Sequence, residues 1–155
     1  VAKSSVEALF SEAAAQGARL VTGGVRPRGD AFARGYWLEP TLYADVTQDM
    51  RVVREEIFGP CGSVIKVADF EEALAIANDT EFGLSAGICT SSLKYAREFR
   101  RRAQAGMVMV NLPTAGVDYH VPFGGRKGSS FGPREQGRYA AEFYTTVKTA
   151  YVFAG

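Results

Sequence analysis

The chain opens on a helical pattern, because apolar and polar side chains alternate with a period near 3.6 between residues 4 and 16. Ser4 and Glu7 have the spacing of a capping box, and Gly17 fits the position after the last turn. The apolar residues expected on one face are Val6, Leu9, Phe10, Ala13 and Ala14. The pattern therefore predicts a helix that packs by one face onto a core.

Strand and turn signals follow in residues 18–56. A short strand is expected before the pair Gly23 and Gly24, and residues 25–35 are polar and rich in turn residues, which predicts a surface loop. Aromatic and β-branched residues around Pro40 indicate strands near a sheet edge or a bend, because proline cannot donate a ladder hydrogen bond. Residues 50–56 predict one or two helical turns that end at a Gly-Pro pair.

Apolar strands and capped helices alternate from residue 62 to residue 111. The expected elements are a strand at 62–67, a helix that buries Phe70, Leu74 and Ala77, a strand at 84–90, a helix at 93–105 and a strand at 107–111. Asp69 with Glu72, and Ser91 or Ser92, supply the N-caps of the two helices. Such alternation of fully apolar strands with helices is typical of a parallel sheet covered on both faces. The predicted fold class is therefore α/β with a parallel sheet.

The last third of the chain differs in character. Residues 112–137 hold six glycines and three prolines, which predicts a long ordered loop, and a short helix is expected near residues 134–143. Residues 144–153 alternate with a β-branched bias and predict a strand with no obvious local partner. This strand is expected to pair with an edge of the sheet or with another subunit.

Composition and charge exclude several classes of protein. With 155 residues, 46% of them hydrophobic, the chain can form one domain with an apolar core. A formal net charge of +1 gives no reason to expect a nucleic-acid or membrane partner. No run approaches the ~20 apolar residues that span a bilayer, and the start lacks a signal peptide, so a cytoplasmic protein is expected. The chain begins without Met inside a helical pattern, which predicts a piece of a longer protein.

The cysteine and histidine content predicts no metal site. Cys61 and Cys89 lack the paired spacing of zinc ligands, and His120 is the single histidine. Without a secretion signal, two free and buried thiols are favoured over a disulfide. His120 lies in the glycine-rich loop, where a hydrogen-bonded surface residue is favoured over a general acid-base group because no partner can be assigned to it.

The stretch EEIFGPC, residues 55–61, is the first candidate for chemistry. A carboxylate of Glu55 or Glu56 can accept hydrogen bonds from both hydroxyls of a ribose diol, and Phe58 can pack against a ligand ring. From the residues alone, two solvated acids and a core phenylalanine are favoured.

Five segments in the same order and spacing resemble the C-terminal part of the aldehyde dehydrogenase superfamily. They are REEIFGP, ANDTEFGLSAGICT, AGMVMVN, VPFGGRKGSSFGPREQG and EFYTTVKTAYV. The resemblance covers the whole chain. Residues 116–151 are most similar to enzymes that oxidise 2-oxoglutarate semialdehyde (2,5-dioxopentanoate).

The resemblance implies an oxidation of an aldehyde to a carboxylate that uses NAD or NADP, through a cysteine thioester. Glu56 matches the glutamate that holds the nicotinamide ribose, and Phe58 matches the aromatic residue beside it. Asn111 and Phe123 match positions near the substrate pocket. This reverses the preference at Glu56 and Phe58, whereas Glu55 is still expected to be structural.

The resemblance also implies that no catalytic residue lies in this chain. The nucleophilic cysteine, the general base, the oxyanion-hole asparagine and the dinucleotide-binding glycines of the family lie upstream of the acidic motif. Neither Cys61 nor Cys89 matches the nucleophile. We therefore expect no activity from the chain alone. The alternative is a non-catalytic fragment or pseudoenzyme that retains only assembly or binding.

Partners and domains follow from the same resemblance. Residues 1–143 are expected to form the C-terminal portion of the catalytic domain, and residues 144–155 an oligomerisation strand shared between subunits of a homo-oligomer. Arg126 and Arg134 are candidates to bind an acidic substrate, although a structural role is favoured for each. The choice between NAD and NADP stays open.

Overall fold

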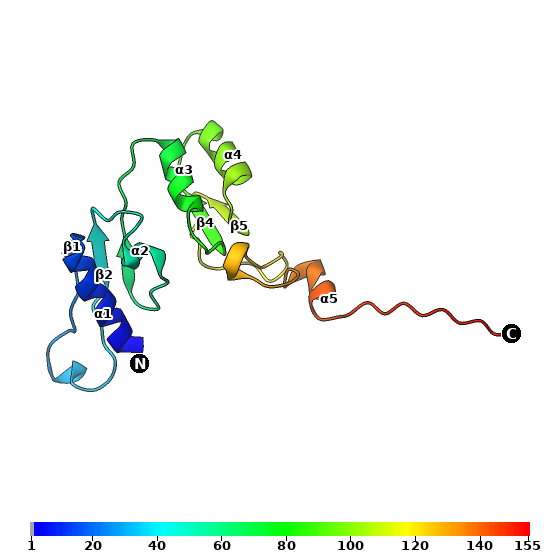
Figure 1. The fold of residues 1–155 in the computed structure, drawn as a ribbon, viewed down its shortest axis with the longest axis horizontal. Coiled ribbons are helices and arrows are strands. Elements are labelled where there is room, and N and C mark those ends of the chain that lie inside the picture. Colours follow the sequence, from blue (N-terminus) through cyan, green and yellow to red (C-terminus); the bar gives the residue numbers. More distant parts are fainter. Residues whose placement is uncertain (1) are drawn as a thin grey trace. The chain divides into compact units, whose positions relative to one another are not determined.

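The computed structural model describes residues 2–155, with side chains from residue 6 onward in the first helix (Figure 1). The chain forms two compact units, residues 1–68 and residues 69–155, called here the first and second unit. The elements of the first unit are α1 (Ala2–Ala15), β1 (Arg19–Thr22), a 3-10 turn (Asp30–Phe32), β2 (Thr41–Ala44), α2 (Arg51–Arg54) and β3 (Cys61–Ser63).

Helix α1 confirms the predicted helix but starts earlier. Because α1 begins at Ala2, Ser4 lies within the helix and is not its N-cap. The C-terminus is as expected. Gly17 takes a left-handed φ of 94° and donates to the Ala14 carbonyl at 3.1 Å, and Ala18 donates to the Ala13 carbonyl at 3.0 Å. These two bonds form a Schellman motif, which directs the chain from the helix into β1.

The sheet of the first unit has the order β1-β2-β3. Strands β1 and β2 are antiparallel, whereas β2 and β3 are parallel, with Thr41 opposite Cys61 and Tyr43 opposite Ser63. The expected strand at 62–67 is shorter and earlier, at Cys61–Ser63. Its neighbour β2 ends at Ala44 and turns away at Asp45, which has a φ of 57°, so the ladder has no further partner there.

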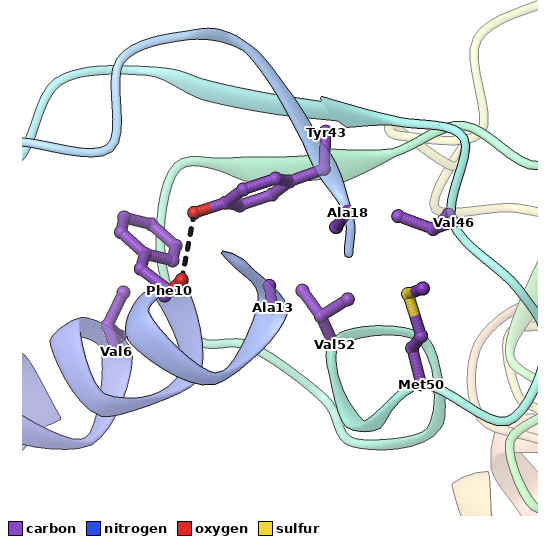
Figure 2. Close-up of a cluster of buried hydrophobic side chains, with 8 residues drawn as sticks. All are labelled: Val6, Phe10, Ala13, Ala18, Tyr43, Val46, Met50 and Val52. Atoms are coloured by element: carbon purple, nitrogen blue, oxygen red, sulfur yellow. Dashed lines mark hydrogen bonds between the residues drawn. The ribbon is translucent and has the colours of Figure 1, made fainter. Parts of the chain in front are cut away.

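One apolar cluster holds the first unit together (Figure 2). Its buried residues are Val6, Phe10, Ala13, Ala18, Tyr43, Val46, Met50 and Val52. The Tyr43 side chain is fully buried, packs edge-on against Phe10 with ring centroids 5.9 Å apart, and donates its hydroxyl to the Phe10 carbonyl at 3.3 Å. Burial, and then the nearby Cys61 thiol, raise the pKa of Tyr43. Ala14, expected on the buried face, is exposed.

The second unit contains α3 (Phe70–Asn78), β4 (Ser85–Ile88), α4 (Leu93–Arg102), β5 (Met107–Val110), two 3-10 turns (Lys127–Ser129 and Gly137–Tyr139) and α5 (Ala140–Phe143). The parallel pair β4-β5 is connected by α4, as predicted. However, β3 pairs with β2, so the three predicted parallel strands belong to two sheets. The side chains of β4 and β5 are mostly half-buried, whereas the apolar pattern predicted strands covered on both faces.

The caps of α3 and α4 are as predicted. The Asp69 carboxylate accepts from the Glu72 amide at 2.9 Å, and the Ser92 hydroxyl accepts from the Tyr95 amide at 3.4 Å. Leu74, Phe99 and Ala103 form the buried cluster of this unit, with half-buried residues around them. Ala77, expected on the buried face of α3, is exposed.

Helix α4 ends at Arg102, three residues before the predicted end. Ala103 takes an extended conformation, and the side chain of Asn78 binds the main chain on both sides of the break. Its amide nitrogen donates to the Arg102 carbonyl at 3.0 Å, and its oxygen accepts from the Gln104 amide at 2.8 Å. These two bonds take the place of the helical hydrogen bonds of the Arg102 carbonyl and the Gln104 amide.

The long loop is ordered without regular structure. Phe123 and Glu135 exchange two main-chain hydrogen bonds, of 2.8 and 2.9 Å, which close the loop on itself. The loop also passes against the start of β5: a Cβ atom added at Gly106 would lie 2.1 Å from the Gly124 carbonyl oxygen. Residue 106 is therefore required to be glycine by close approach.

The expected strand at residues 144–153 has no regular structure here. This segment extends away from α5 (Figure 1), and its apolar side chains are almost fully exposed. A strand needs a neighbour to hydrogen-bond to, and no described part of the second unit offers one to this segment.

Candidate functional site

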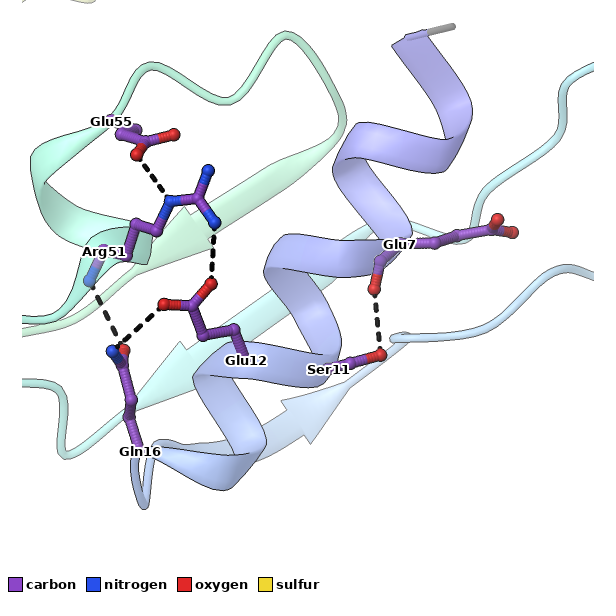
Figure 3. A network of polar contacts seen from close by, with 6 residues as sticks. All are labelled: Glu7, Ser11, Glu12, Gln16, Arg51 and Glu55. Atoms are coloured by element: carbon purple, nitrogen blue, oxygen red, sulfur yellow. Dashed lines mark hydrogen bonds and ion pairs between the residues drawn. The ribbon is translucent and has the colours of Figure 1, made fainter.

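Glu55 lies at the end of α2 in a network of charges (Figure 3). Its carboxylate pairs with Arg51, and the same guanidinium binds Glu12 of α1 at 2.8 Å. The hydrogen bond from Arg51 lowers the pKa of Glu55, while Glu55 and then Glu12 raise the pKa of Arg51. Glu55 therefore has the structural role expected of it, since it ties α2 to α1 through Arg51.

Glu56 is the next residue, and its side chain has a different environment. It is exposed, and within the part of the chain that the structure describes it makes no hydrogen bond or ion pair. Helix α2 ends at Arg54, and its C-cap Glu55 is extended with φ −97° and ψ 145°. The Glu55 carboxylate, at the helix end, is therefore held in a structural ion pair with Arg51. The Glu56 carboxylate, one residue later, is free to accept a ligand.

Phe58 lies in the turn between α2 and β3. This turn is fixed by main-chain bonds from Gly59 to the Ile57 carbonyl and from Thr41 to the Pro60 carbonyl, both 2.8 Å. The side chain is 81% exposed, so the core position favoured from the residues alone is wrong. A Gly-Pro turn that points an aromatic ring outward places that ring where a ligand can contact it.

The Phe58 ring lines a pocket of about 310 Å³ in the first unit. The other lining residues are Val6, Tyr36, Trp37, Leu38, Gly59 and Pro60. Three of these residues come from the segment that leads into β2. Tyr36 and Trp37 are not among the site residues predicted from sequence. The signal that could have indicated them is the run Tyr36-Trp37 directly after a turn-rich loop.

Asn111 lies just after β5 and joins the ends of β4 and β5. Its main chain has a φ of 56° and donates to the Ile88 carbonyl at 2.8 Å. Its side-chain oxygen accepts from the Thr90 amide at 2.8 Å, and its side-chain nitrogen donates to the Thr90 carbonyl at 2.9 Å. The amide of Asn111 is thus fully engaged at the carboxyl end of the parallel pair.

Phe123 lies in the long loop of the second unit and is half-buried. A pocket of about 320 Å³ lies in the same unit, and neither Asn111 nor Phe123 lines it. The pocket is lined by Met107, Val108, Met109, Leu112, Pro113, Ala115, Gly116, Val117, Asp118, Val121 and Pro122. Asn111 and Phe123 are each next to a lining residue in the sequence, Leu112 and Pro122, and their place near a substrate pocket stays a prediction.

Three of the four basic side chains of the loop differ in their surroundings. Arg134 has a buried Nη1 atom with no hydrogen-bond partner among the described residues, and it lies against the main chain at Gly106 and Gly124. Arg126 is exposed, and its main-chain amide donates to the Gly83 carbonyl at 2.9 Å. His120 is exposed beside the Tyr119 ring.

The two thiols are unpaired, as predicted, but only one is sheltered. Cys61 is half-buried, and burial raises the pKa of its thiol. Cys89 is exposed, so the prediction that both thiols are buried is wrong for this residue. Among the described residues, no cluster of His, Cys, Asp and Glu could hold a metal ion, and no helix is both long and apolar enough to cross a membrane.

Comparison with known proteins assigns the family. The model of the aldehyde dehydrogenase family matches residues 2–150, which is nearly the whole chain. The chain belongs to the aldehyde dehydrogenase family. Its α/β fold agrees with that assignment. It is also similar to the NAD-dependent aldehyde dehydrogenase of Sinorhizobium meliloti, with a TM-score of 0.87 and 37% identity, over 99% of this chain and 30% of that one.

Curated family members show closer similarity in sequence. The alpha-ketoglutarate semialdehyde dehydrogenase of Haloferax volcanii is 50% identical over 90% of this chain and 29% of its own length. The betaine aldehyde dehydrogenase of Brucella anthropi is 44% identical over 91% of this chain and 28% of its own length. The chain thus spans about three tenths of the length of the curated relatives it matches.

Proposed function

We propose that this chain is part of an aldehyde dehydrogenase that uses NAD or NADP to oxidise a 2-oxo acid semialdehyde to a carboxylate. Family membership and the 50% identity to an alpha-ketoglutarate semialdehyde dehydrogenase support the reaction class and the substrate. The observation that carries the assignment of a site is the free, exposed carboxylate of Glu56, two residues before a phenylalanine that lines a pocket.

In this proposal Glu56 accepts hydrogen bonds from both hydroxyls of the nicotinamide ribose, because a carboxylate offers two acceptor oxygens. Phe58 flanks the ring that the ribose carries. The dinucleotide, when bound, accepts the hydride released as the aldehyde is oxidised. Asn111, held by Thr90, and Phe123 border the substrate side. The cysteine nucleophile is assigned to a segment outside this chain, because neither Cys61 nor Cys89 matches the family nucleophile.

The cofactor role is tested by titrating the complete protein with NAD and NADP in a calorimeter. Glu56→Gln should weaken binding about 10- to 100-fold, since a hydrogen bond to a charged group contributes ~1.5–3 kcal/mol. Glu142→Gln, an exposed acid of the second unit, is the matched control and should bind like the parent. Equal affinities of the Glu56 and Glu142 variants would refute the ribose contact.

A non-catalytic fragment or pseudoenzyme that retains assembly is the second candidate. The exposed apolar tail favours an assembly role: Val147 is 97%, Tyr151 95% and Phe153 94% exposed. In both candidates residues 144–155 form an intersubunit strand of a homo-oligomer, next to a catalytic portion at residues 1–143. Deletion of residues 145–155 from the complete protein should reduce its size in solution; an unchanged oligomer would refute the strand.

Activity separates the two candidates. With 2,5-dioxopentanoate as substrate, the 155-residue chain alone should not reduce NAD or NADP. The enzymatic proposal requires that the complete protein reduces one of them with the same substrate. A cytoplasmic location belongs to the same proposal, and two unpaired thiols suit that reducing compartment.

An acidic substrate calls for a basic group, and Arg126 is the better candidate. Its side chain is exposed, whereas the Arg134 guanidinium is inserted among the loop glycines. In the complete enzyme, Arg126→Ala should raise KM for 2,5-dioxopentanoate more than KM for a neutral aldehyde of similar length. Equal changes for both aldehydes would assign Arg126 a structural role.

A further inference from the structure

The guanidinium of Arg51 joins the two helices of the first unit (Figure 3). From the first residue of α2, it binds the Glu12 carboxylate of α1 at 2.8 Å and the Glu55 carboxylate one helical turn later. Glu56, the proposed ligand of the ribose, is the next residue. A charged group that is paired on both sides therefore lies just before the proposed ribose contact.

Helix α1 holds Arg51 at a second point. The Gln16 side-chain oxygen accepts from the Arg51 main-chain amide at 3.3 Å, and the Gln16 side-chain nitrogen donates to Glu12 at 3.3 Å. Glu12 and Gln16 are four residues apart, so both bind from the same face of α1. The position of Arg51 is therefore set by α1 and does not depend on the short α2 alone.

Glu55 links this network to residue 56. Its main-chain amide donates to the Arg51 carbonyl at 2.9 Å, and its main chain is extended, with φ −97° and ψ 145°. Successive side chains of an extended chain point in opposite directions. Because the Glu55 carboxylate is turned toward Arg51, the Glu56 carboxylate is directed to the opposite side of the chain.

The chain after Glu56 is anchored in a different way. The Ile57 side chain packs against the apolar cluster of the first unit, and the Gly59 amide donates to the Ile57 carbonyl at 2.8 Å. Glu56 thus lies between one side chain held by an ion pair and one held by apolar packing. The ion pair with Arg51 is the charged half of this support.

Arg51 also distinguishes two adjacent carboxylates. Glu55 and Glu56 each have two oxygens that can accept hydrogen bonds from a ribose diol. The hydrogen bond from Arg51 engages the Glu55 carboxylate and lowers its pKa, so that it stays ionised and paired. Without the guanidinium, Glu55 would be released as a second free carboxylate beside Glu56.

We propose that Arg51 is a positioning residue for the cofactor: by holding Glu55 against α1, it directs the Glu56 carboxylate toward the nicotinamide ribose. The inference rests on the proposed contact between Glu56 and that ribose, and it adds the residue that preorganises the contact. A group that is oriented before binding loses less conformational entropy on binding. Loss of Arg51 should therefore weaken dinucleotide binding through Glu56.

A double-mutant cycle in the complete protein tests this role, with the affinity for NAD and NADP measured by calorimetry. Arg51→Met should weaken dinucleotide binding about two- to tenfold, the range for ordering one side chain on binding. In the Glu56→Gln background the same change should have no further effect, because the carboxylate that Arg51 positions is gone. KM for the aldehyde at saturating dinucleotide should be unchanged.

Variants that keep part of the network serve as comparisons. Arg51→Lys keeps a cation beside Glu55 and should bind the dinucleotide more tightly than Arg51→Met. Glu12→Gln removes the charge on α1, and it takes the place of Arg51→Met in the cycle if circular dichroism shows that Arg51→Met does not fold. Arg102→Met breaks an arginine–glutamate pair of the second unit and, as the matched control, should bind like the parent.

The outcomes separate this inference from the proposed function. If Glu56→Gln weakens binding while Arg51→Met has no effect, or has the same effect with and without Glu56, the positioning role is overturned and the ribose contact stands. If Glu56→Gln itself binds like the parent, the ribose contact is overturned and the positioning role with it.

Discussion

At the scale of single residues, Asn78 shows how one side chain can end one helix and hold another. It is the last residue of α3, and its amide binds the main chain at Arg102 and Gln104 where α4 stops. The Lys127 ammonium from the long loop donates to the Asn78 and Thr80 carbonyls, at 2.6 and 3.0 Å. The ends of two helices and the loop thus meet at one polar junction.

Replacing Asn78 by Ala should destabilise the chain by about 1–3 kcal/mol, because two hydrogen bonds at a half-buried site are lost. The urea midpoint measures this loss. Gln104→Ala is the control, since it keeps the main-chain amide that Asn78 binds. A Gln104 variant as unstable as the Asn78 variant would contradict the role of the Asn78 amide.

The two thiols should differ in reactivity. Cys89 is exposed, whereas Cys61 is half-buried and its pKa is raised by burial, which lowers its thiolate fraction near neutral pH. Labelling with a disulfide reagent at pH 7.5 should show a fast and a slow phase. Cys89→Ser should abolish the fast phase and Cys61→Ser the slow one; the reverse assignment would show that β3 opens readily.

Single-residue roles were only partly predictable from sequence. The contrast between Glu55 and Glu56 depends on where α2 ends and on Arg51, which reaches Glu12 of another helix. Arg51 and Glu12 are far apart in the sequence, so no local sequence pattern predicts their contact. The exposure of Phe58 is a second case, because a Gly-Pro turn sets the direction of the ring while composition predicts only that phenylalanine prefers burial.

At the scale of elements, the N-cap of α3 is the clearest local signal in the chain. Asp69→Ala should reduce stability by about 1 kcal/mol, because the Glu72 amide loses its acceptor. Asp69→Ser, which also caps helices well, should restore most of the loss. Equal destabilisation by Ala and Ser in thermal unfolding would show that the carboxylate acts in some other way.

The pairing of α3 with α4 should depend on pH. Hydrogen bonding to Arg102 lowers the pKa of Glu71, and the two contacts are 2.8 and 2.6 Å long. Because the pKa is lower in the folded chain, the stabilisation is present above the unfolded pKa of about 4.3 and is lost as pH falls through the folded value.

Thermal unfolding between about pH 5 and pH 3 measures this loss. Glu71→Gln should flatten the pH dependence in that window, and 1 M salt should weaken it in the parent because both groups are exposed. A Gln variant with the parent's pH profile would exclude Glu71 as its source.

The helices followed from periodicity and caps, whereas several element ends and the strand expected at residues 144–153 did not. Helix α1 starts before Ser4 despite the capping-box spacing, and α4 stops at Arg102 because Asn78 supplies an alternative to the next helical bond. The strand at 62–67 is cut short by the end of β2, its neighbour. For α4 and for the strand, a partner distant in sequence decides the boundary.

At the scale of the whole molecule, the two units carry apolar cores of unequal size. The first unit buries eight residues in one cluster, whereas the second buries three in its own. Hydrogen exchange should therefore protect the amides of β1 and β2 more than those of β4 and β5, because local stability follows buried apolar contacts. Equal protection in both units would contradict this ranking.

The family and fold class were predictable because five motifs follow one another in order between residues 54 and 152, and the family model matches residues 2–150. The arrangement of strands was not, because an apolar run does not identify its neighbour: β3 pairs with β2. The residues that line the pocket of the first unit, Tyr36 and Trp37 among them, were not predicted for a related reason. Arg26 and Trp37 fix a loop through main-chain carbonyls, and any residue can supply a carbonyl.

Gly106 makes the second unit sensitive to any substitution at this position, however small the new side chain is. Any missense codon at this position adds at least a methyl group, which would meet the Gly124 oxygen, the Arg134 guanidinium and the Gly125 backbone at once. Even alanine, usually a mild replacement, should act there as a loss-of-function allele through misfolding. One added carbon atom at residue 106 is therefore expected to be enough to disrupt the packing of the long loop against β5.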